Sequence, residues 1–98
     1  MRRRAIVHPL FQNDIDEAVV WYEGKSPGLG ARFEGQLNAC LHKVEERPLS
    51  FQVARGSLRQ ARLDDFPFGV IFEVSEDLLL IYGLFHLARD RSVWESRT

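Results

Sequence analysis

The stretch LLLIYGLFH, residues 78–86, decides how this chain folds. Apolar side chains follow one another from Leu78 to Phe85, so an extended strand here is apolar on both of its faces. A strand of that kind belongs inside a sheet, between neighbouring strands and beneath covering layers. We therefore predict that residues 78–86 form an interior strand around which the rest of the fold is built.

Two further strands are predicted before this one. Residues 67–74 alternate phenylalanine and valine with other residues at a period of two, and residues 75–77 (Ser-Glu-Asp) suit a hairpin turn. Residues 57–63 read as another strand, which ends at the break made by the acidic pair at 64–65 and by Pro67. The C-terminal half is thus predicted to be a three-stranded meander.

The N-terminal half has a helical period instead. After a short predicted strand at residues 4–8, apolar residues fall on one face of a helix at 10–24, with acidic residues including Asp14 on the other face. The same period continues from Leu29 to Val44, and Pro48 ends it. The order is β-α-α-β-β-β, which predicts an α+β fold with a two-helix hairpin on one face of a four-stranded, mainly antiparallel sheet.

This arrangement leaves one face of the sheet uncovered. A helix hairpin covers a single face, yet the strand at residues 78–86 is apolar on both. We expect the segment from Leu87 onward to fold over part of the second face. A dozen residues cover too little area for a whole sheet, so we expect another chain to cover the rest.

Composition narrows the class of protein. Ninety-eight residues with 45% hydrophobic content predict a single domain over residues 1–98, and no apolar run reaches the roughly 20 residues of a membrane helix. The apolar stretch after Arg4 stops at His8-Pro9, too early for a signal peptide, so we expect a cytoplasmic protein that does not bind membranes. A net charge of −1 argues against a protein whose main partner is the phosphate backbone, although it leaves room for a local basic patch, and we expect no direct sequence-specific nucleic-acid binding. Cys40 is the single cysteine and the three histidines lack ligand spacing, so we expect no metal and no cofactor.

Read along its length, the sequence resembles the ParE-like branch of the RelE/ParE superfamily, the toxins of bacterial type II toxin-antitoxin systems that are also described as plasmid-stabilisation proteins. The resemblance depends on the order and spacing of several short segments. They are residues 14–18 (DIDEA), 21–23 (WYE), 26–33 (SPGLGARF), Pro48, 58–63 (LRQARL), 66–68 (FPF), and the terminal pattern His86-x-x-Arg89-Asp90-x-x-x-Trp94-x-x-Arg97.

The resemblance implies a toxin that a cognate ParD-like antitoxin wraps and neutralises in a hetero-oligomeric complex, in agreement with the uncovered sheet face. It leaves two activities open. ParE-type members inhibit DNA gyrase by binding it, whereas RelE-type members cleave messenger RNA on the ribosome. We favour inhibition by binding, with DNA gyrase as the leading target and no catalytic residue. A ParE-like domain without toxicity that serves only to bind a partner is a third alternative.

The residues that we expect to contact partners are mostly cationic or aromatic. They are Trp21, Arg59, Arg62, His86, Arg89, Trp94 and Arg97. In the ribonuclease alternative, His86, Arg89 and Arg59 supply a base and cations for the scissile phosphate. That set is incomplete, because RelE-type sequences place lysines and tyrosines near this position and the segment after Arg89 has neither.

The same residues also have ordinary structural explanations. Arg59 and Arg62 are three positions apart, which directs them to opposite faces of a strand, and either can pair with a nearby carboxylate. His86 can be an end-of-strand histidine bonded to a neighbouring carboxylate, and Trp94 can be a cap that packs on the sheet. Trp21 is expected at the edge of the first helix's apolar stripe, where an indole is suited to a partner.

Overall fold

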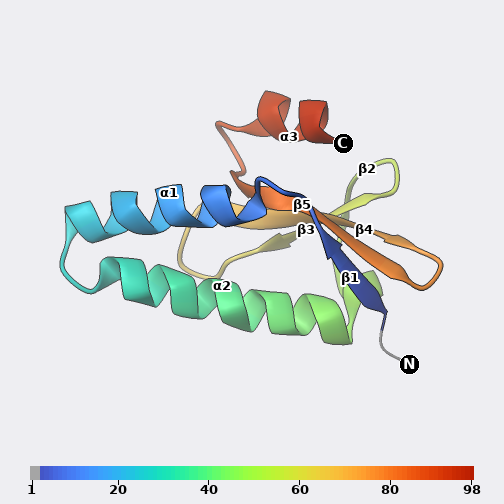
Figure 1. The fold of residues 1–98 in the computed structure, drawn as a ribbon, viewed down its shortest axis with the longest axis horizontal. Coiled ribbons are helices and arrows are strands. Elements are labelled where there is room, and N and C mark those ends of the chain that lie inside the picture. The colour runs from blue at the N-terminus through green and yellow to red at the C-terminus, as the bar shows by residue number, and fades with distance from the viewer. Residues whose placement is uncertain (1–2) are drawn as a thin grey trace.

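Five strands form one mixed sheet in the computed structural model, which describes residues 3–98 (Figure 1). Their order across the sheet is β1-β5-β4-β3-β2, with β1 parallel to β5 and every other neighbouring pair antiparallel. The strands are β1 (Arg4–Val7), β2 (Val53–Arg55), β3 (Leu58–Arg62), β4 (Phe68–Ser75) and β5 (Leu78–His86). The predicted interior position of β5 is confirmed, since it lies between β1 and β4.

Helices cover both faces of this sheet to different extents. The hairpin of α1 (Phe11–Lys25) and α2 (Leu29–Glu46) packs on one face, and a 3-10 turn, η1 (Pro48–Ser50), follows α2. The short helix α3 (Arg91–Arg97) lies on the other face, so that in Figure 1 the strands run between α3 above and α2 below. The predicted helix hairpin is therefore confirmed, together with its place on a single face.

The predicted number of strands was wrong, because the sheet has five strands and not four. The additional strand, β2, is only three residues long and pairs with β3 across a tight turn at residues 56–57. Gly56 adopts a left-handed backbone conformation there, with φ at +56°, which glycine tolerates without steric cost. Three residues are too few to show an alternating pattern, so no period of two marks this strand.

The turn between the two long helices is held by one carboxylate. Glu23 accepts hydrogen bonds of 2.9 Å from the backbone N–H groups of both Gly28 and Gly30 at the start of α2. These N–H groups have no partner inside the helix, so the carboxylate caps them and also complements the helix dipole. A Cβ on Gly30 would lie 2.8 Å from the carbonyl oxygen of Val19, so the close crossing of α1 and α2 depends on glycine here.

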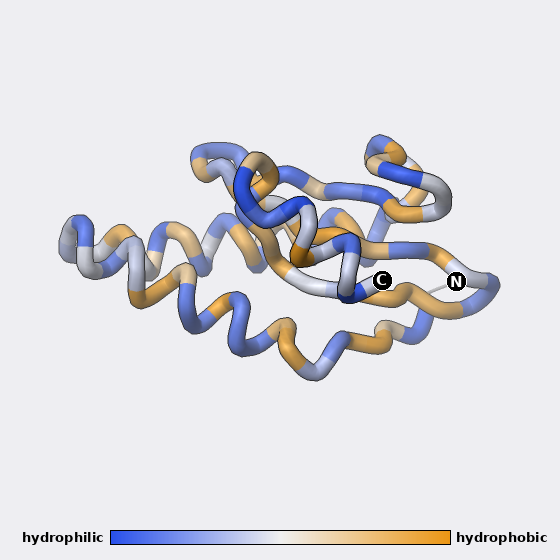
Figure 2. Tube along the Cα trace, turned by 90° about the horizontal axis from the view of Figure 1, so that it is seen from above, coloured by the Kyte–Doolittle hydropathy of each residue, from blue (hydrophilic) through white to orange (hydrophobic). Residues whose placement is uncertain are grey.

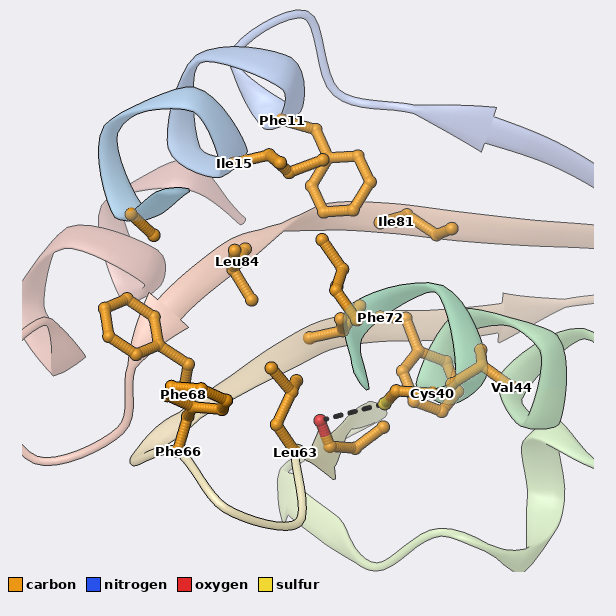
Figure 3. Close-up of a cluster of buried hydrophobic side chains, with 14 of the residues drawn as sticks. Phe11, Ile15, Cys40, Val44, Leu63, Phe66, Phe68, Phe72, Ile81 and Leu84 are labelled. Atoms are coloured by element: carbon orange, nitrogen blue, oxygen red, sulfur yellow. Dashed lines mark hydrogen bonds between the residues drawn. The ribbon is translucent and has the colours of Figure 1, made fainter. Parts of the chain in front are cut away.

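The main core fills the space between the helix hairpin and the sheet. Figure 2 shows hydrophilic and hydrophobic residues alternating along both long helices, as expected for helices with one buried face. Figure 3 shows the buried side chains of α1, α2 and the strands meeting around Phe72 and Leu84. Cys40 lies among them, and its thiol donates to the carbonyl oxygen of Ala61 at a sulfur–oxygen distance of 3.6 Å. Cys40 is therefore a buried packing residue.

A bulge in β5 adjusts which side chains face the helices. Ile81 pairs with Phe72 and Gly83 pairs with Ile71, so Tyr82 is an extra residue without a counterpart on β4. The insertion shifts the alternation by one, and Leu84 as well as Ile81 joins the core beneath the helices. The same shift directs Phe85 to the opposite face.

The C-terminal segment covers the middle of the second face, as expected. Trp94 of α3 is 4% exposed and packs with Leu58, Ile71 and Phe85 in a second hydrophobic cluster. The C-terminal segment does not cover the edge of this face at β1, where Ile6 is 42% exposed. The expectation that another chain covers the remainder stays a prediction.

Candidate partner-binding site

A buried ion pair joins the first long helix to the last turn of the chain. The Arg97 guanidinium donates to the two carboxylate oxygens of Asp14, with Nη1 2.5 Å from Oδ2 and Nη2 3.1 Å from Oδ1. The Asp14 carboxylate also accepts from the backbone N–H of Leu84 at 3.1 Å, and Arg97 donates to the carbonyl oxygen of Tyr82 at 3.2 Å. The two side chains are only 9% and 11% exposed, so each charge depends on the other.

Glycine 83 makes room for this ion pair. A Cβ at this position would lie 2.5 Å from Arg97 Nη1, 2.7 Å from Asp14 Oδ2 and 2.6 Å from the ring of Phe85. The guanidinium carbon of Arg97 also lies over the Phe85 ring, 4.7 Å from its centroid. The ion pair, Gly83 and Phe85 thus form one unit, which fixes α3 on the second face of the sheet.

His86 organises the turn between β5 and α3. The ring atom Nδ1 of His86 accepts hydrogen bonds from the backbone N–H groups of Ala88 at 3.3 Å and Arg89 at 3.1 Å. The backbone N–H of His86 donates to the Asp90 carboxylate at 2.9 Å. Because Nδ1 acts as an acceptor, the ring proton of neutral His86 resides on Nε2, which leaves no free nitrogen lone pair. His86 therefore has a local structural role, although its ring bonds backbone N–H groups and only its backbone N–H meets a carboxylate, that of Asp90.

A groove of about 400 Å³ opens between α1, the end of β5 and α3. We call it the α1–α3 groove, and Asp14 and Arg97 lie among its lining residues. The exposed residues on its walls, which can meet a partner, are Asn13, Glu17, Trp21, Arg89 and Val93. Acidic, aromatic, cationic and aliphatic groups are thus presented within one concave surface.

Trp21 is the most prominent aromatic group at this groove. Its side chain is 52% exposed and packs edge-on against Tyr22, with ring centroids 4.9 Å apart, while Lys25 Nζ lies 4.5 Å from its ring centroid. The predicted position of Trp21 at the edge of the apolar stripe is confirmed. Burial raises the pKa of the neighbouring Tyr22 hydroxyl, and the positive charge of Arg89 opposes that shift.

The seven residues predicted from the sequence are not all brought together. Trp21, Arg89 and Arg97 line the α1–α3 groove, whereas His86 lies beneath the turn next to it. Trp94 is buried in the second hydrophobic cluster and Arg97 is bound to Asp14, so in this conformation both fasten α3 instead of facing solvent. The explanation of Trp94 as a cap on the sheet agrees with its burial.

Arg59 and Arg62 lie apart from this groove, on β3. They belong to opposite faces of the strand, as their spacing predicted, since Arg59 pairs with Phe72 and Arg62 pairs with Gly69. Arg59 is half-buried, and its guanidinium donates to the carbonyl oxygen of Phe51 at 2.7 Å. Arg62 is exposed at the edge of the sheet, where β3 continues beyond its pairing with β2.

The residues of the ribonuclease alternative do not converge on one point. Arg59 pairs with Phe72, whereas His86 pairs with Phe68, so the two positions are four residues apart along β4, or about 13 Å, and lie on separate strands. The Nδ1 of His86 is occupied by two backbone donors, and Arg59 holds a backbone carbonyl. Arg59 and His86 as placed do not act together in acid–base chemistry on one phosphate.

Asp14 is the residue that sequence reasoning placed wrongly. It was predicted on the polar face of the first helix, but its side chain is nearly buried. Phe11, Asp14, Ile15 and Ala18 follow the i, i+3, i+4, i+7 spacing of a buried stripe, so the carboxylate occupies a core position. A carboxylate at such a position requires a buried cation, and that requirement was the available signal for Arg97 as its partner.

Comparison with known proteins agrees with the fold. No protein-family model matches the chain, and no curated protein matches it in sequence. Among solved structures, the chain matches one described as the chromosomal ParDE TA system from P. aeruginosa, with a TM-score of 0.72. The match covers 84% of this chain and 92% of that chain at 13% sequence identity. The resemblance inferred from the sequence is thus confirmed at the level of the fold, which this chain shares with that structure.

One further structural feature concerns membranes. Within residues 3–98, none of the helices combines the length and the apolar character that crossing a bilayer requires.

Proposed function

We propose that this chain is the toxin of a type II toxin-antitoxin pair, that it acts in the cytoplasm, and that it inhibits an essential bacterial target by binding. The leading candidate for the target is DNA gyrase, and a cognate ParD-like antitoxin neutralises the toxin. The observation that carries the proposal is the ParE-like fold, which extends over most of the chain in a structural match to a ParDE system.

Inhibition by binding is favoured over RNA cleavage by the arrangement of the side chains. The candidate catalytic residues are used for structure: His86 holds a turn and Arg59 holds the segment at Phe51. The α1–α3 groove, by contrast, offers a half-exposed indole beside Arg89, Glu17 and Val93. Exposed aromatic and arginine side chains around a concave surface are typical of protein–protein contacts.

We assign the antitoxin to the α1–α3 groove and to the part of the second sheet face that α3 leaves open. Trp21 and Arg89 are the proposed contacts in the groove, because both are exposed there. Replacing Trp21 with alanine should weaken antitoxin binding by roughly tenfold or more, since an anchoring tryptophan typically contributes at least 2 kcal/mol. The matched control is Val20→Ala, next to Trp21 and 72% exposed but outside the groove lining, which should change binding less than threefold.

Induced expression in a bacterial host separates the proposal from its alternatives. Growth arrest with a DNA-damage response and intact transcripts is the expected result. Cleaved transcripts would instead support a ribonuclease, and unhindered growth with a folded chain would support a domain that only binds partners. The variant His86→Asn retains a side-chain acceptor for the turn, so under the proposal it should keep toxicity within about tenfold.

A further inference from the structure

Three adjoining hollows surround the half-buried ring of Phe51, where the end of α2 meets the edge of β3. Lys43 and Arg47 line the first, of about 410 Å³, and Gln60 and Arg62 line the second, of about 610 Å³. Lys43 and Arg62 meet again in the third, of about 160 Å³. We call these residues, Lys43, Arg47, Phe51, Gln60 and Arg62, the Phe51 surface.

The three cations of this surface lack carboxylate partners. Within residues 3–98, neither Lys43, Arg47 nor Arg62 takes part in an ion pair. The carboxylates that share the hollows are Glu46, which lies 3.2 Å from His42, and Asp64. Arg59 adds a fourth positive charge next to Phe51, because its guanidinium donates to the Phe51 carbonyl oxygen at 2.7 Å. Four cationic groups and two carboxylates thus lie around Phe51, on a chain whose net charge is −1.

The fold explains only part of this gathering of cations. The C-terminal end of α2 attracts positive charge through the helix dipole, which accounts for Lys43 and Arg47. Arg62 comes from β3, far along the chain, and its guanidinium makes no hydrogen bond within residues 3–98. Lys43, Arg47 and Arg62 form no ion pair within residues 3–98, so these three cations are available for a partner of opposite charge.

We propose that the Phe51 surface binds an acidic polypeptide segment that carries two or three carboxylates around one apolar side chain. The carboxylates meet Lys43, Arg47 and Arg62, because guanidinium groups bind carboxylates with two parallel hydrogen bonds and ammonium groups attract them as point charges. The apolar side chain packs against Phe51. Opposite charge of this kind steers association and selects the partner.

A polypeptide suits this surface better than a nucleic acid does. The Phe51 ring is half-buried and packs perpendicular to Phe72, with centroids 5.8 Å apart, so it presents less area than the exposed rings on which successive bases stack. Nucleic-acid binding without base contacts depends on neutralising many phosphates, and the excess here is two charges. A short acidic segment matches that excess.

The Phe51 surface is separate from the α1–α3 groove. The groove lies over β5 and the surface lies at β3, with β4 between them, which places the two strands roughly 10 Å apart. One molecule can therefore hold a partner in the groove and an acidic segment at the Phe51 surface together. This inference goes beyond the proposed function, since it stands whether or not the chain is toxic.

The test measures binding of a synthetic peptide to the purified full chain. The probe is a fluorescein-labelled dodecapeptide of glutamate and aspartate with a central leucine, compared with the same peptide in which glutamine and asparagine replace the acids. The variant Lys43→Glu/Arg62→Glu removes the surface charge. The variant Arg4→Glu/Lys25→Glu is the matched control, because it changes the net charge equally through two exposed cations elsewhere.

Fluorescence anisotropy at low ionic strength should give saturable binding of the acidic peptide alone. The surface variant should raise Kd by roughly tenfold or more, the control by less than about threefold, and added salt should weaken binding. Absence of saturable binding, or an equal loss in both variants, would overturn the proposal. So would tighter binding of a single-stranded oligonucleotide that the surface variant abolishes. If the glutamate variant does not fold, Lys43→Gln/Arg62→Gln tests the same contacts, and unchanged peptide affinity there would likewise refute it.

Discussion

Replacing Gly83 with alanine should loosen the attachment of α3 and lower the stability of the whole chain. The added Cβ would lie within 2.7 Å of atoms of Asp14, Phe85 and Arg97, well inside contact distance. The backbone at Gly83 does not adopt a left-handed conformation, so the effect is purely steric. One methyl group therefore acts directly on the buried ion pair.

The loss of stability depends on how far the side chains around Gly83 can shift to make room for the added methyl group. Overpacking a rigid site typically costs about 1–3 kcal/mol, and separating a buried ion pair costs about 3–5 kcal/mol. The ends of Arg97 and Phe85 can shift, but the Asp14 carboxylate is also bonded to the N–H of Leu84, so a partial separation is expected. We predict a loss of about 2–4 kcal/mol, which lowers Tm by about 10–25 °C in a chain of this size.

Thermal unfolding followed by circular dichroism measures this loss, and trypsin cleavage after Arg91 reports release of α3. The matched control is Gly35→Ala in α2, where an added Cβ meets nothing within 4 Å. That change should stabilise the chain by about 0.4–1 kcal/mol, since alanine reduces the entropy of the unfolded chain. A Gly83→Ala variant with the Tm and the cleavage rate of the parent chain would refute the role given to the Asp14–Arg97 pair.

Three further substitutions test other parts of the structure. Gly30→Ala should lower the free energy of unfolding by about 1–3 kcal/mol in a urea titration, despite alanine's higher helix propensity, because the added Cβ would lie 2.8 Å from the Val19 carbonyl oxygen. A gain in the free energy of unfolding would contradict the close crossing of α1 and α2. Burial raises the pKa of Cys40 from 9.0 to about 11, so a thiol reagent should not label the native chain at neutral pH. Because that pKa is raised on folding, the stability that the protonated thiol contributes is present below pH 9 and is lost as pH rises through about 11. A Cys40→Ala variant that loses the same stability over this pH range would exclude this cause. Trp94→Ala should cost about 3–5 kcal/mol, measured by thermal unfolding, and an unchanged Tm would show that α3 does not roof the second face.

The long elements could be predicted because their patterns repeat. Apolar residues at helical spacing located α1 and α2 to within a residue or two, and the alternation at residues 67–74 located β4. Residues 78–86 are apolar on both faces of a strand, and this pattern correctly predicted that β5 lies between two other strands. Each of these signals extends over eight or more residues, enough for a period to be distinguished from chance.

The features that were missed depend on single residues or on long-range contacts. The three residues of β2 show no period, and the bulge at Tyr82 is a property of the pairing between strands. Asp14 was assigned by its charge, although its position on the buried stripe pointed to the core. Its partner Arg97 is 83 residues away, a separation that no local pattern spans.

The candidate site was predicted in part for the same reason. The terminal pattern correctly drew attention to the segment after β5, but it could not distinguish exposed contacts from structural ones. Trp94 and Arg97 fasten α3, His86 holds a turn, and Arg89 remains exposed at the groove. Arg62 belongs to a different surface, because β4 separates its strand from β5.

The most direct test of the central claim is DNA supercoiling by purified gyrase in the presence of the purified chain. An inhibitor that acts by binding should abolish supercoiling at concentrations comparable to that of gyrase, leave added messenger RNA intact on ribosomes, and lose its effect when the cognate antitoxin is added. Unimpaired supercoiling at a large molar excess of folded chain, together with cleavage of ribosome-bound messenger RNA, would contradict it.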